Sequence, residues 1–251
     1  MPVPPVRWKA PFSDMERRAD AATGKRPIRS FVRREGRLTA GQQRALELLW
    51  PAFGLERPPA GQPLDLDRAF GRRAPRILEI GFGNGESLAE QAATHPERDY
   101  LGIEVHRPGV GHLLMEVEKR HLGNVRVMMA DAAEVLAHHI PDGSLHGVQL
   151  FFPDPWPKKR HHKRRLVQPQ WVRAVAAKLA PGGFLHLATD WADYAEHMLD
   201  VLEAEPDLEN TCGPRQFSPR GERPETKFER RGLRKGHQVF DLYYRKREHP
   251  G

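Results

Sequence analysis

The sequence predicts an α/β fold in which a mainly parallel, twisted sheet carries helices on both faces. Three observations predict it. Short apolar segments alternate with longer amphipathic segments between residues 76 and 202, as parallel strands do when helices connect them. A glycine-rich turn, Gly81 to Gly85, follows the first apolar segment. The last apolar segment, residues 238–244, alternates with a period of two, which is typical of an antiparallel strand.

The length and charge of the chain suit one domain with a polyanionic partner. A chain of 251 residues fits a single α/β domain of ordinary size. Its 40 Lys and Arg residues exceed its 33 Asp and Glu residues, so the formal net charge is +7, and clusters of these cations favour nucleic acid. Cys212 is the single cysteine, which excludes an internal disulfide framework and fits the reducing cytoplasm.

The hydropathy pattern gives no sign of a membrane protein. The sequence starts without the apolar core of a signal peptide, and no stretch is long and apolar enough to cross a bilayer. We therefore expect a cytoplasmic protein with no membrane partner and no obligatory protein partner, acting as a monomer.

The first 37 residues differ in composition from the rest, and we interpret them as a basic, flexible arm ahead of a main domain at residues 38–251. Arg, Pro and small residues dominate the arm, and such segments are typically disordered on their own. For residues 1–27, a solubilising tail and an arm that orders on RNA are equally good interpretations. For residues 28–37 we favour the RNA-binding arm.

Between the arm and the sheet, the sequence predicts one helix and a linker. Thr39 can cap a helix that runs to Trp50 and ends at Pro51. A Pro- and Gly-rich linker, residues 57–71, then leads to the first strand.

The main domain alternates strands and helices. We expect strands at residues 76–80, 100–105, 125–129, 148–152 and 184–188, and helices at 86–94, 109–121, 131–136, 168–179 and 190–202. A Pro181-Gly182-Gly183 turn precedes the fifth strand. The last strand should pair antiparallel with a strand near residues 210–217.

The turn after the first strand has the features of a nucleoside-binding loop. Gly81, Gly83 and Gly85 let the backbone approach a ligand closely. In dinucleotide sites a further glycine follows and a diphosphate binds the helix N-terminus, but here that position is Glu86. Together with Glu79, this carboxylate favours a cationic ligand. S-adenosylmethionine, which carries an ammonium and a sulfonium group, fits that requirement.

Two further acids follow neighbouring strands of the predicted sheet. Glu104 ends the second strand, where doubly wound folds place an acid that accepts hydrogen bonds from both ribose hydroxyls. Asp131 follows the third strand and could accept from an adenine amino group. Asp131 is also placed to cap the next helix, and the two roles are compatible.

The most distinctive stretch is a proline-stiffened turn followed by a dense run of cations. The strand that ends at Phe152 runs into Pro153-Asp154-Pro155-Trp156-Pro157. Because prolines withhold backbone donors and fix φ, Asp154 should lie in a rigid turn. Lys158 to Arg165 follow at once. Aromatic rings, a carboxylate and clustered cations suit a flat base joined to a phosphate backbone; the alternative is a strand end with a solvated basic loop.

These motifs together resemble one protein family. The matching stretches are SFVRREGRLTAGQ from Ser30, LEIGFGNG from Leu78, LGIEVHRPG from Leu101, QLFFPDPWPKKRHHKRRL from Gln149, ATDWADYAEHML from Ala188 and TKFERRG from Thr226. They span residues 28 to 244 and resemble the bacterial tRNA (guanine-N7-)-methyltransferases.

The resemblance implies a Rossmann-like class I methyltransferase fold, S-adenosylmethionine as methyl donor and a guanosine in the variable loop of tRNA as target. Carried over by position, the cofactor site would contain Glu79, Gly81, Gly83, Gly85, Glu104, Asp131 and Asp154, and Asp154 would also be catalytic. Substrate contacts would come from Lys158, Asp190, Thr226, Lys227, Phe228 and Glu229. RNA contacts would come from Arg160, His161, His162, Lys163, Arg164 and Arg165.

Methyl transfer to guanine N7 requires no general base. Guanine N7 carries a lone pair and no proton, so the enzyme must mainly orient donor and acceptor and stabilise charge. Asp154 would accept from the guanine N1 and N2 protons and favour the positive charge that the base gains. Trp156 and Phe152 are interpreted either as stacking faces for the base or as ordinary core residues.

Several alternatives stay open at this point. Asp190 can cap a helix, and the spacing of Thr226 and Glu229 matches a capping box. Adjacent histidines do not converge on one ion, so we predict no metal. A nicotinamide oxidoreductase is disfavoured by Glu86 and by the basic run. An RNA-binding protein on an inactive methyltransferase fold is the remaining rival.

Overall fold

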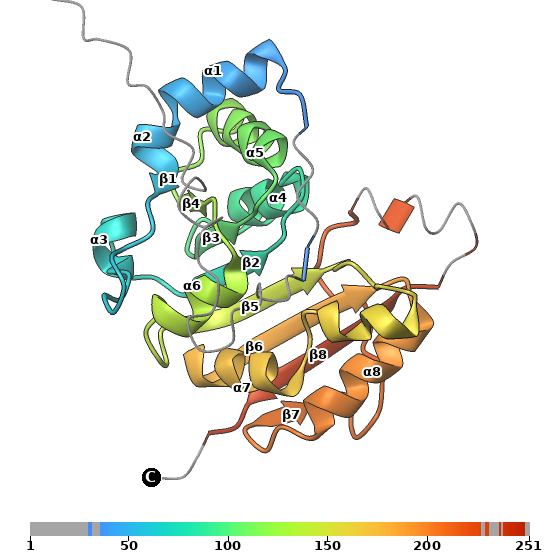
Figure 1. Ribbon diagram of the computed structural model, residues 1–251. Helices are drawn as coiled ribbons and strands as arrows, with labels where there is room; N and C mark the ends of the chain where they lie inside the picture. Colours follow the sequence, from blue (N-terminus) through green and yellow to red (C-terminus); the bar gives the residue numbers. More distant parts are fainter. Residues whose placement is uncertain (1–29, 32–35, 227–228, 231–235, 237, 249–251) are drawn as a thin grey trace, which may run out of the picture.

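The computed structural model describes residues 30–31, 36–226, 229–230, 236 and 238–248, so most of the predicted arm lies outside it. Its strands are β1 (Gly54–Leu55), β2 (Arg76–Ile80), β3 (Asp99–Ile103), β4 (Val125–Met128), β5 (Leu145–Phe151), β6 (Leu179–Thr189), β7 (Leu208–Asn210) and β8 (Phe240–Lys246). They form one sheet in the order β1-β4-β3-β2-β5-β6-β8-β7 (Figure 1). All neighbouring pairs from β1 to β6 are parallel, and β8 is antiparallel to β6 and β7. The predicted, mainly parallel sheet with an antiparallel last strand is confirmed, whereas β1 was not predicted and β7 overlaps the strand predicted near residues 210–217 only at Asn210.

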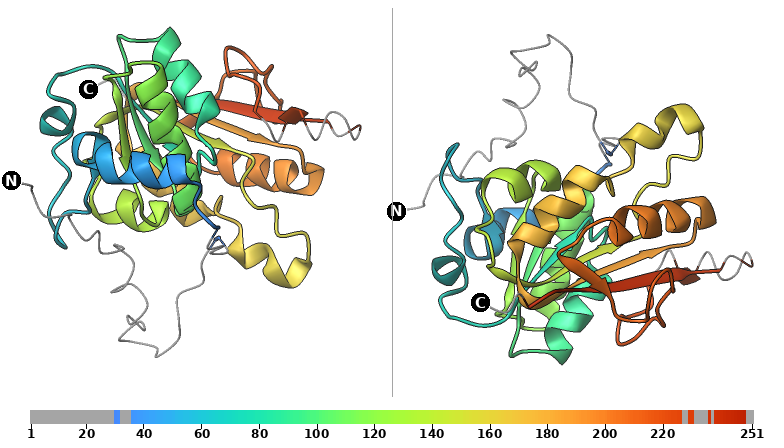
Figure 2. Two further views of the ribbon diagram at one scale, coloured as in Figure 1. Left: turned by 90° about the horizontal axis from the view of Figure 1, so that it is seen from above. Right: turned by 90° about the horizontal axis from the view of Figure 1, so that it is seen from below.

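Helices cover both faces of this sheet because successive strand residues point to opposite sides. The helices are α1 (Ala40–Leu48), α2 (Trp50–Phe53), α3 (Leu66–Phe70), α4 (Glu86–Thr94), α5 (Arg107–Lys119), α6 (Ala132–His138), α7 (Pro169–Lys178) and α8 (Ala192–Glu203). Ile77 of β2 packs in one core cluster with α1, α2, α4 and α5. Leu78 and Ile80 pack in the other with α3, α6, α7 and α8. Figure 2 shows α4 and α5 on the side of the sheet opposite to α7 and α8.

Local sequence signals placed most of these elements. β2 and α4 have the predicted bounds, and Thr39 forms the predicted cap of α1, a reciprocal capping box with Gln42. Within the described part of the chain, no helix combines the length and the hydropathy needed to span a bilayer.

Two predictions around residues 50–71 were wrong. Pro51 does not end the helical region, because a second helix, α2, starts at Trp50 and holds Pro51 in its first turn, where no helical hydrogen bond is lost. The predicted linker contains α3. Its signals are the N-cap Asp65, which accepts from Arg68 N at 2.9 Å, and the C-cap Gly71 at φ 70°.

The Pro181-Gly183 turn lies inside β6 rather than before it. Leu179 pairs with Leu145 and Phe184 pairs with Gly147, so the residues between Leu179 and Phe184 bulge out of register with β5. β6 therefore begins earlier than predicted and continues through the bulge to Thr189.

Candidate active site

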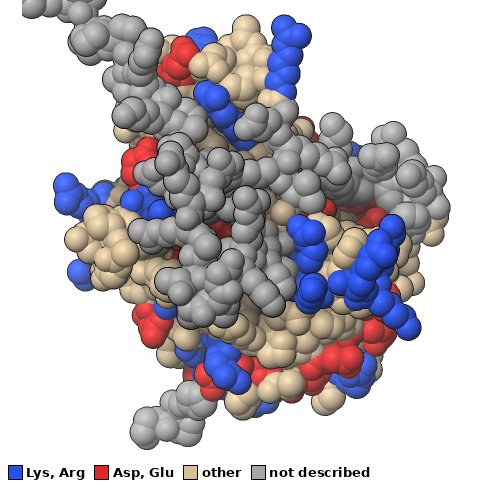
Figure 3. Space-filling view, in the orientation of Figure 1, with Lys and Arg blue, Asp and Glu red and all other residues tan. Residues whose placement is uncertain are grey.

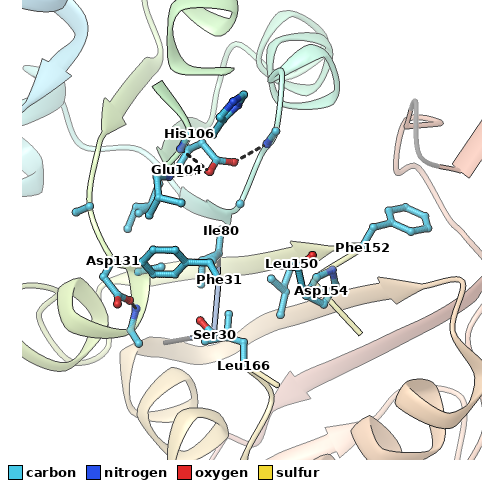
Figure 4. A pocket seen from close by; sticks show the side chains of 18 of the residues that line it. Ser30, Phe31, Ile80, Glu104, His106, Asp131, Leu150, Phe152, Asp154 and Leu166 are labelled. Carbon is cyan, nitrogen blue, oxygen red and sulfur yellow. Dashed lines mark hydrogen bonds between the residues drawn. The ribbon is translucent and has the colours of Figure 1, made fainter. Parts of the chain in front are cut away.

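A cavity of about 950 Å³ opens at the carboxyl ends of β2, β3, β4 and β5. Because these strands are neighbours and parallel, the turns that follow them lie together at the carboxyl ends of the strands. Five of the predicted cofactor residues line the cavity: Gly81, Gly83, Glu104, Asp131 and Asp154 (Figure 4). Ser30 and Phe31, from the segment predicted to be an RNA-binding arm, line it as well.

The β2–α4 turn has a conformation that requires glycine. Gly81, Gly83 and Gly85 have φ angles of 69°, 60° and 75°, in the left-handed region. A Cβ atom on Gly85 would lie 2.6 Å from Cβ of Leu113 in α5. Any larger residue would therefore push α5 away from the turn.

Glu104 holds this turn against the end of β3. Its Oε1 accepts from the backbone N–H groups of Val105 at 2.7 Å and His106 at 3.0 Å, and its Oε2 accepts from Gly83 N at 2.9 Å. A carboxylate has about four acceptor positions, so about one remains for a ligand. Acceptance from two ribose hydroxyls would require one of the backbone bonds to lengthen.

Glu79 lies behind the turn and is not among the residues that line the cavity. The residue is 3% exposed, and its Oε2 accepts from Gln91 Nε2 of α4 at 3.5 Å. Burial, reinforced by the nearby charge of Glu104, raises the pKa of Glu79 to about 8. At neutral pH this carboxyl is therefore mainly protonated.

Replacement of Glu79 by glutamine should change how protein stability depends on pH. The unfolded carboxyl ionises near its ordinary pKa of 4.5, whereas the folded one holds its proton up to about pH 8. The wild-type free energy of unfolding should consequently fall by up to about 1.4 kcal/mol per pH unit in this window, relative to Glu79→Gln. Urea denaturation at pH 5, 6.5 and 8 measures the difference, and a difference that stays constant with pH would refute the assignment.

Asp131 is both a helix cap and a cavity residue. Its Oδ1 accepts from Ala133 N at 3.0 Å at the start of α6. This confirms the predicted cap and leaves the side chain at the cavity wall.

The turn after β5 is strained at two positions. Phe152 and Trp156 have φ angles of 53° and 46°, which are uncommon for large residues and cost roughly 1 kcal/mol or more each. Between them lie Pro153, Asp154 and Pro155. Asp154 is exposed at the cavity, and Figure 4 shows it on the side of Leu150, across from Asp131.

An arginine side chain lies against the ring of each aromatic residue of this turn. The Trp156 indole donates to Ser30 O at 3.1 Å, and the Arg164 guanidinium lies 4.1 Å from its ring centroid. Phe152 points away from Asp131 and Glu104 in Figure 4, and the guanidinium of Arg223 lies 5.7 Å from its ring. One face of Trp156 is therefore already covered by a cation.

The basic run forms a short 3₁₀ helix, η2 (Lys159–Arg164), beside the turn. Lys159, Arg160 and Lys163 are exposed, and Figure 3 shows Lys and Arg side chains gathered on this face. Arg165 differs from its neighbours: its side chain is 1% exposed, forms an ion pair with Asp193 and donates to Pro155 O at 2.9 Å. Arg165 was predicted to contact RNA, but its buried side chain instead holds the turn that carries Asp154.

Sequence and structure comparisons agree with this geometry. A family model described as "Putative methyltransferase" matches residues 73–242. The tRNA (guanine-N(7)-)-methyltransferase of Halorhodospira halophila is 66% identical over 88% of this chain and 96% of its own length. That of Alcanivorax borkumensis is 60% identical over 91% of this chain and 96% of its own length.

The chain belongs to the tRNA (guanine-N(7)-)-methyltransferase family. The solved structure of the 16S rRNA methyltransferase KamB is similar in fold, with a TM-score of 0.55, 17% identity, and coverage of 74% of this chain and 95% of that one. The class I methyltransferase fold predicted from the sequence is thereby confirmed.

The predicted substrate residues that the structure describes in this methyltransferase lie outside the cavity lining. Lys158 is exposed and directly precedes η2. Asp190 lies between β6 and α8, next to Thr189, whose Oγ1 accepts from Trp191 N at 3.2 Å. Neither residue lines the cavity. Lys227 and Phe228 lie outside the described residues.

Thr226 and Glu229 form the capping box that their spacing suggests. Glu229 N donates to Thr226 Oγ1 at 3.1 Å, and Thr226 N donates to Glu229 Oε2 at 3.4 Å. Arg230, the next residue, lies 3.7 Å from Glu86 in the first turn of α4. The segment is thereby placed next to the glycine turn of the methyltransferase.

A buried ionic cluster, which no sequence pattern indicated, supports the site. The Arg223 side chain is fully buried; it donates to Asp241 at 2.8 and 2.9 Å and to Glu229 at 2.5 and 3.2 Å. Its guanidinium also lies 5.4 Å from the ring of Phe151. His186 on β6 lies 2.8 Å from Asp241. Local spacing could not reveal Asp241 as a partner of Arg223 and His186, because β8, which carries Asp241, is placed by its pairing with β6.

Proposed function

We propose that this chain methylates N7 of a guanine in the variable loop of tRNA, with S-adenosylmethionine as the methyl donor. The observation that carries the proposal is that the cavity, the Asp154 turn and the basic helix η2 all lie at or beside the carboxyl end of β5. A nucleoside cofactor, a target base and a phosphate backbone can therefore be bound side by side. The reaction would take place in the cytoplasm, with the protein acting as a monomer.

The residues of the cavity fit S-adenosylmethionine. Glu104 and Asp131 supply carboxylate acceptors at the ends of adjacent strands, where the ribose and adenine of a nucleoside would lie. The glycine turn leaves room for close approach of the ligand. When bound, S-adenosylmethionine supplies an electrophilic methyl group on a positively charged sulfur, and the acidic residues around the cavity favour that charge.

Asp154 would position the target base. Its carboxylate, at the edge of the cavity, can accept from guanine N1–H and the N2 amino group, which fixes the base plane and leaves N7 turned to the donor. Because N7 carries no proton, no side chain has to remove one. The carboxylate would also stabilise the positive charge that the purine gains.

The residues around the rim would hold the RNA. Lys158 and the exposed cations of η2 lie next to the turn that carries Asp154, so phosphates near the target nucleotide can be neutralised there. The target base has to leave its stack to reach Asp154, as is usual for base-modifying enzymes.

One experiment tests the activity. The protein is incubated with an unmodified tRNA transcript and radiolabelled S-adenosylmethionine, and the labelled base is mapped by chain cleavage at N7-methylguanosine. We expect one labelled guanosine in the variable loop. Tight tRNA binding without any transfer would instead indicate an RNA-binding protein on an inactive methyltransferase fold.

Neutralisation of η2 should weaken tRNA binding without impairing the chemistry. In Lys159→Ala/Arg160→Ala/Lys163→Ala, the slope of log affinity against log salt should fall by roughly 0.7–0.9 for each phosphate that is no longer neutralised, while kcat at saturating tRNA stays nearly unchanged. Filter binding between 50 and 300 mM KCl measures the slope. The control Arg73→Ala/Lys119→Ala/Arg247→Ala removes exposed cations at the other end of the sheet, next to the amino ends of its parallel strands. Equal slopes for both triple variants would contradict the assignment.

A further inference from the structure

A second cavity, of about 530 Å³, lies on the α4 face of the sheet over β5, β6 and β8. The strand register explains its composition: Gly147 and Gln149 of β5 pair with Phe184 and His186 of β6, and these pair with Arg245 and Tyr243 of β8. All six residues therefore project to one face. Over β2 and β3 this face is covered by α4, whereas here the segment 211–223 lies over it (Figure 2). The two cavities share no lining residue.

Aromatic rings line the cavity. Phe184 and Tyr243 are nearly parallel, with an interplanar angle of 14° and ring centroids 5.3 Å apart. The Phe184 ring lies across Gly147, since a Cβ atom there would be 2.3 Å from Phe184 Cζ. His186 meets Tyr243 edge-on at 5.3 Å. Such a surface suits a flat aromatic ligand, and bases stack on aromatic side chains with little regard to sequence.

Two buried oxygen atoms in the lining lack a hydrogen-bond partner among the described residues: Gln149 Oε1 and Ser218 Oγ. Gln149 is 5% exposed, and its Nε2 is already occupied by Gln91 Oε1 at 2.7 Å. Buried polar atoms are rarely left unpaired in folded proteins. A ligand that brings N–H donors into the cavity would satisfy them.

The charged residues that line the cavity are mostly cationic. Arg98, Arg220 and Arg245 line it. Burial raises the pKa of the Tyr243 hydroxyl, the charges of Arg245 and Arg98 act to lower this pKa, and the charge of Glu222 acts to raise it. Glu222 is the acidic residue of the lining, and its Oε2 lies 3.9 Å from His95 Nε2. The planar guanidinium groups of arginine pairs favour multiply charged oxyanions such as phosphate.

We propose that this cavity is a second nucleotide-binding site. The base would stack on the Phe184–Tyr243 surface and donate an N–H group to Gln149 Oε1, and the phosphate would bind Arg98 and Arg245. The cavity volume lies within the range of roughly 300–1,000 Å³ that is usual for small-molecule sites. The nucleotide can be free or part of an RNA chain, since both present the same base and phosphate.

The test uses the full-length protein saturated with S-adenosylhomocysteine, so that the first cavity is blocked. Adenosine 5′-monophosphate is titrated calorimetrically into the wild type and into two charge-matched variants. Arg98→Ala/Arg245→Ala removes the two cations that are proposed to bind the phosphate. Arg215→Ala/Arg247→Ala removes two exposed arginines that form surface ion pairs elsewhere. Filter binding of an unmodified tRNA transcript to the same three proteins identifies the source of the nucleotide.

We expect the wild type to bind the monophosphate saturably, and Arg98→Ala/Arg245→Ala to bind it about tenfold or more weakly. The wild type should bind adenosine, which lacks the phosphate, with a similarly reduced affinity. The control variant should bind like the wild type. A loss of monophosphate binding with unchanged tRNA affinity indicates a free nucleotide as the ligand. A larger loss of tRNA affinity than in the control indicates a nucleotide of the RNA. If both double variants bind both probes equally, the proposal is overturned, whatever the methyl-transfer assay shows.

Discussion

Replacement of Asp154 by asparagine is expected to slow methyl transfer by about 100-fold or more while leaving the affinity for S-adenosylmethionine nearly unchanged. Asparagine has the same size, so the strained turn from Phe152 to Trp156 can be kept. Its amide can accept at one atom only, and its NH₂ group would face an N–H donor of guanine. The variant would therefore misorient the base and lose the negative charge that stabilises the methylated purine.

Single-turnover assays with labelled S-adenosylmethionine measure this loss, and calorimetry measures cofactor affinity. Asp142→Asn is a matched control, because Asp142 is exposed, pairs with Lys178 at 2.6 Å and precedes β5 at the opposite end of the strand. Its activity should equal that of the wild type. Unchanged turnover in Asp154→Asn would rule out the proposed role, and an equally large loss of cofactor affinity would assign Asp154 to the donor instead of the base.

Replacement of Arg223 by leucine is expected to lower the free energy of unfolding by about 3–5 kcal/mol and to abolish measurable activity. The substitution leaves Glu229 and Asp241 buried without their shared cation; their side chains are only 5% and 4% exposed. It also removes the guanidinium that contacts Phe151 and Phe152, which lead into the Asp154 turn. The free energy of unfolding and the methyl-transfer activity should therefore both fall in this variant.

Urea denaturation tests this prediction, with Arg215→Leu as the control. Arg215 also pairs with two carboxylates, Glu196 and Asp200, but all three side chains are more than half exposed, so the loss should be much smaller than in Arg223→Leu. In the Arg223→Leu background, Glu229→Gln and Asp241→Asn together should restore part of the stability, because they remove the unpaired charges. No restoration would show that packing, rather than charge, accounts for the loss.

The parts of the fold that depend on local signals could be predicted closely from the sequence. The glycine turn marks where β2 ends and α4 begins, and the Thr39 capping box marks the start of α1. α3 was missed because its proline-rich surroundings hid a clear N-cap at Asp65 and C-cap at Gly71. In that stretch, composition was a poorer guide than cap spacing.

The residues of the candidate site that belong to one sequence motif could be predicted. Contacts between segments that are distant in the sequence could not. Glu104, Asp131 and Asp154 each follow a strand, so topology alone brings them together. Arg165 could not be separated from the cations around it, because only the end of η2 turns it inward towards Asp193 and the Tyr194 ring. Arg223 and Asp241 become partners only through the antiparallel pairing of β8.

The position of β8 has a consequence for synthesis on the ribosome. β8 is the last described strand in chain order, yet it lies inside the sheet between β6 and β7 and supplies Asp241 to Arg223. A nascent chain that has already exposed its glycine turn and its Asp154 turn still lacks this support. Catalytic competence should therefore arrive abruptly, once Lys246 has cleared the exit tunnel, rather than grow as each motif emerges.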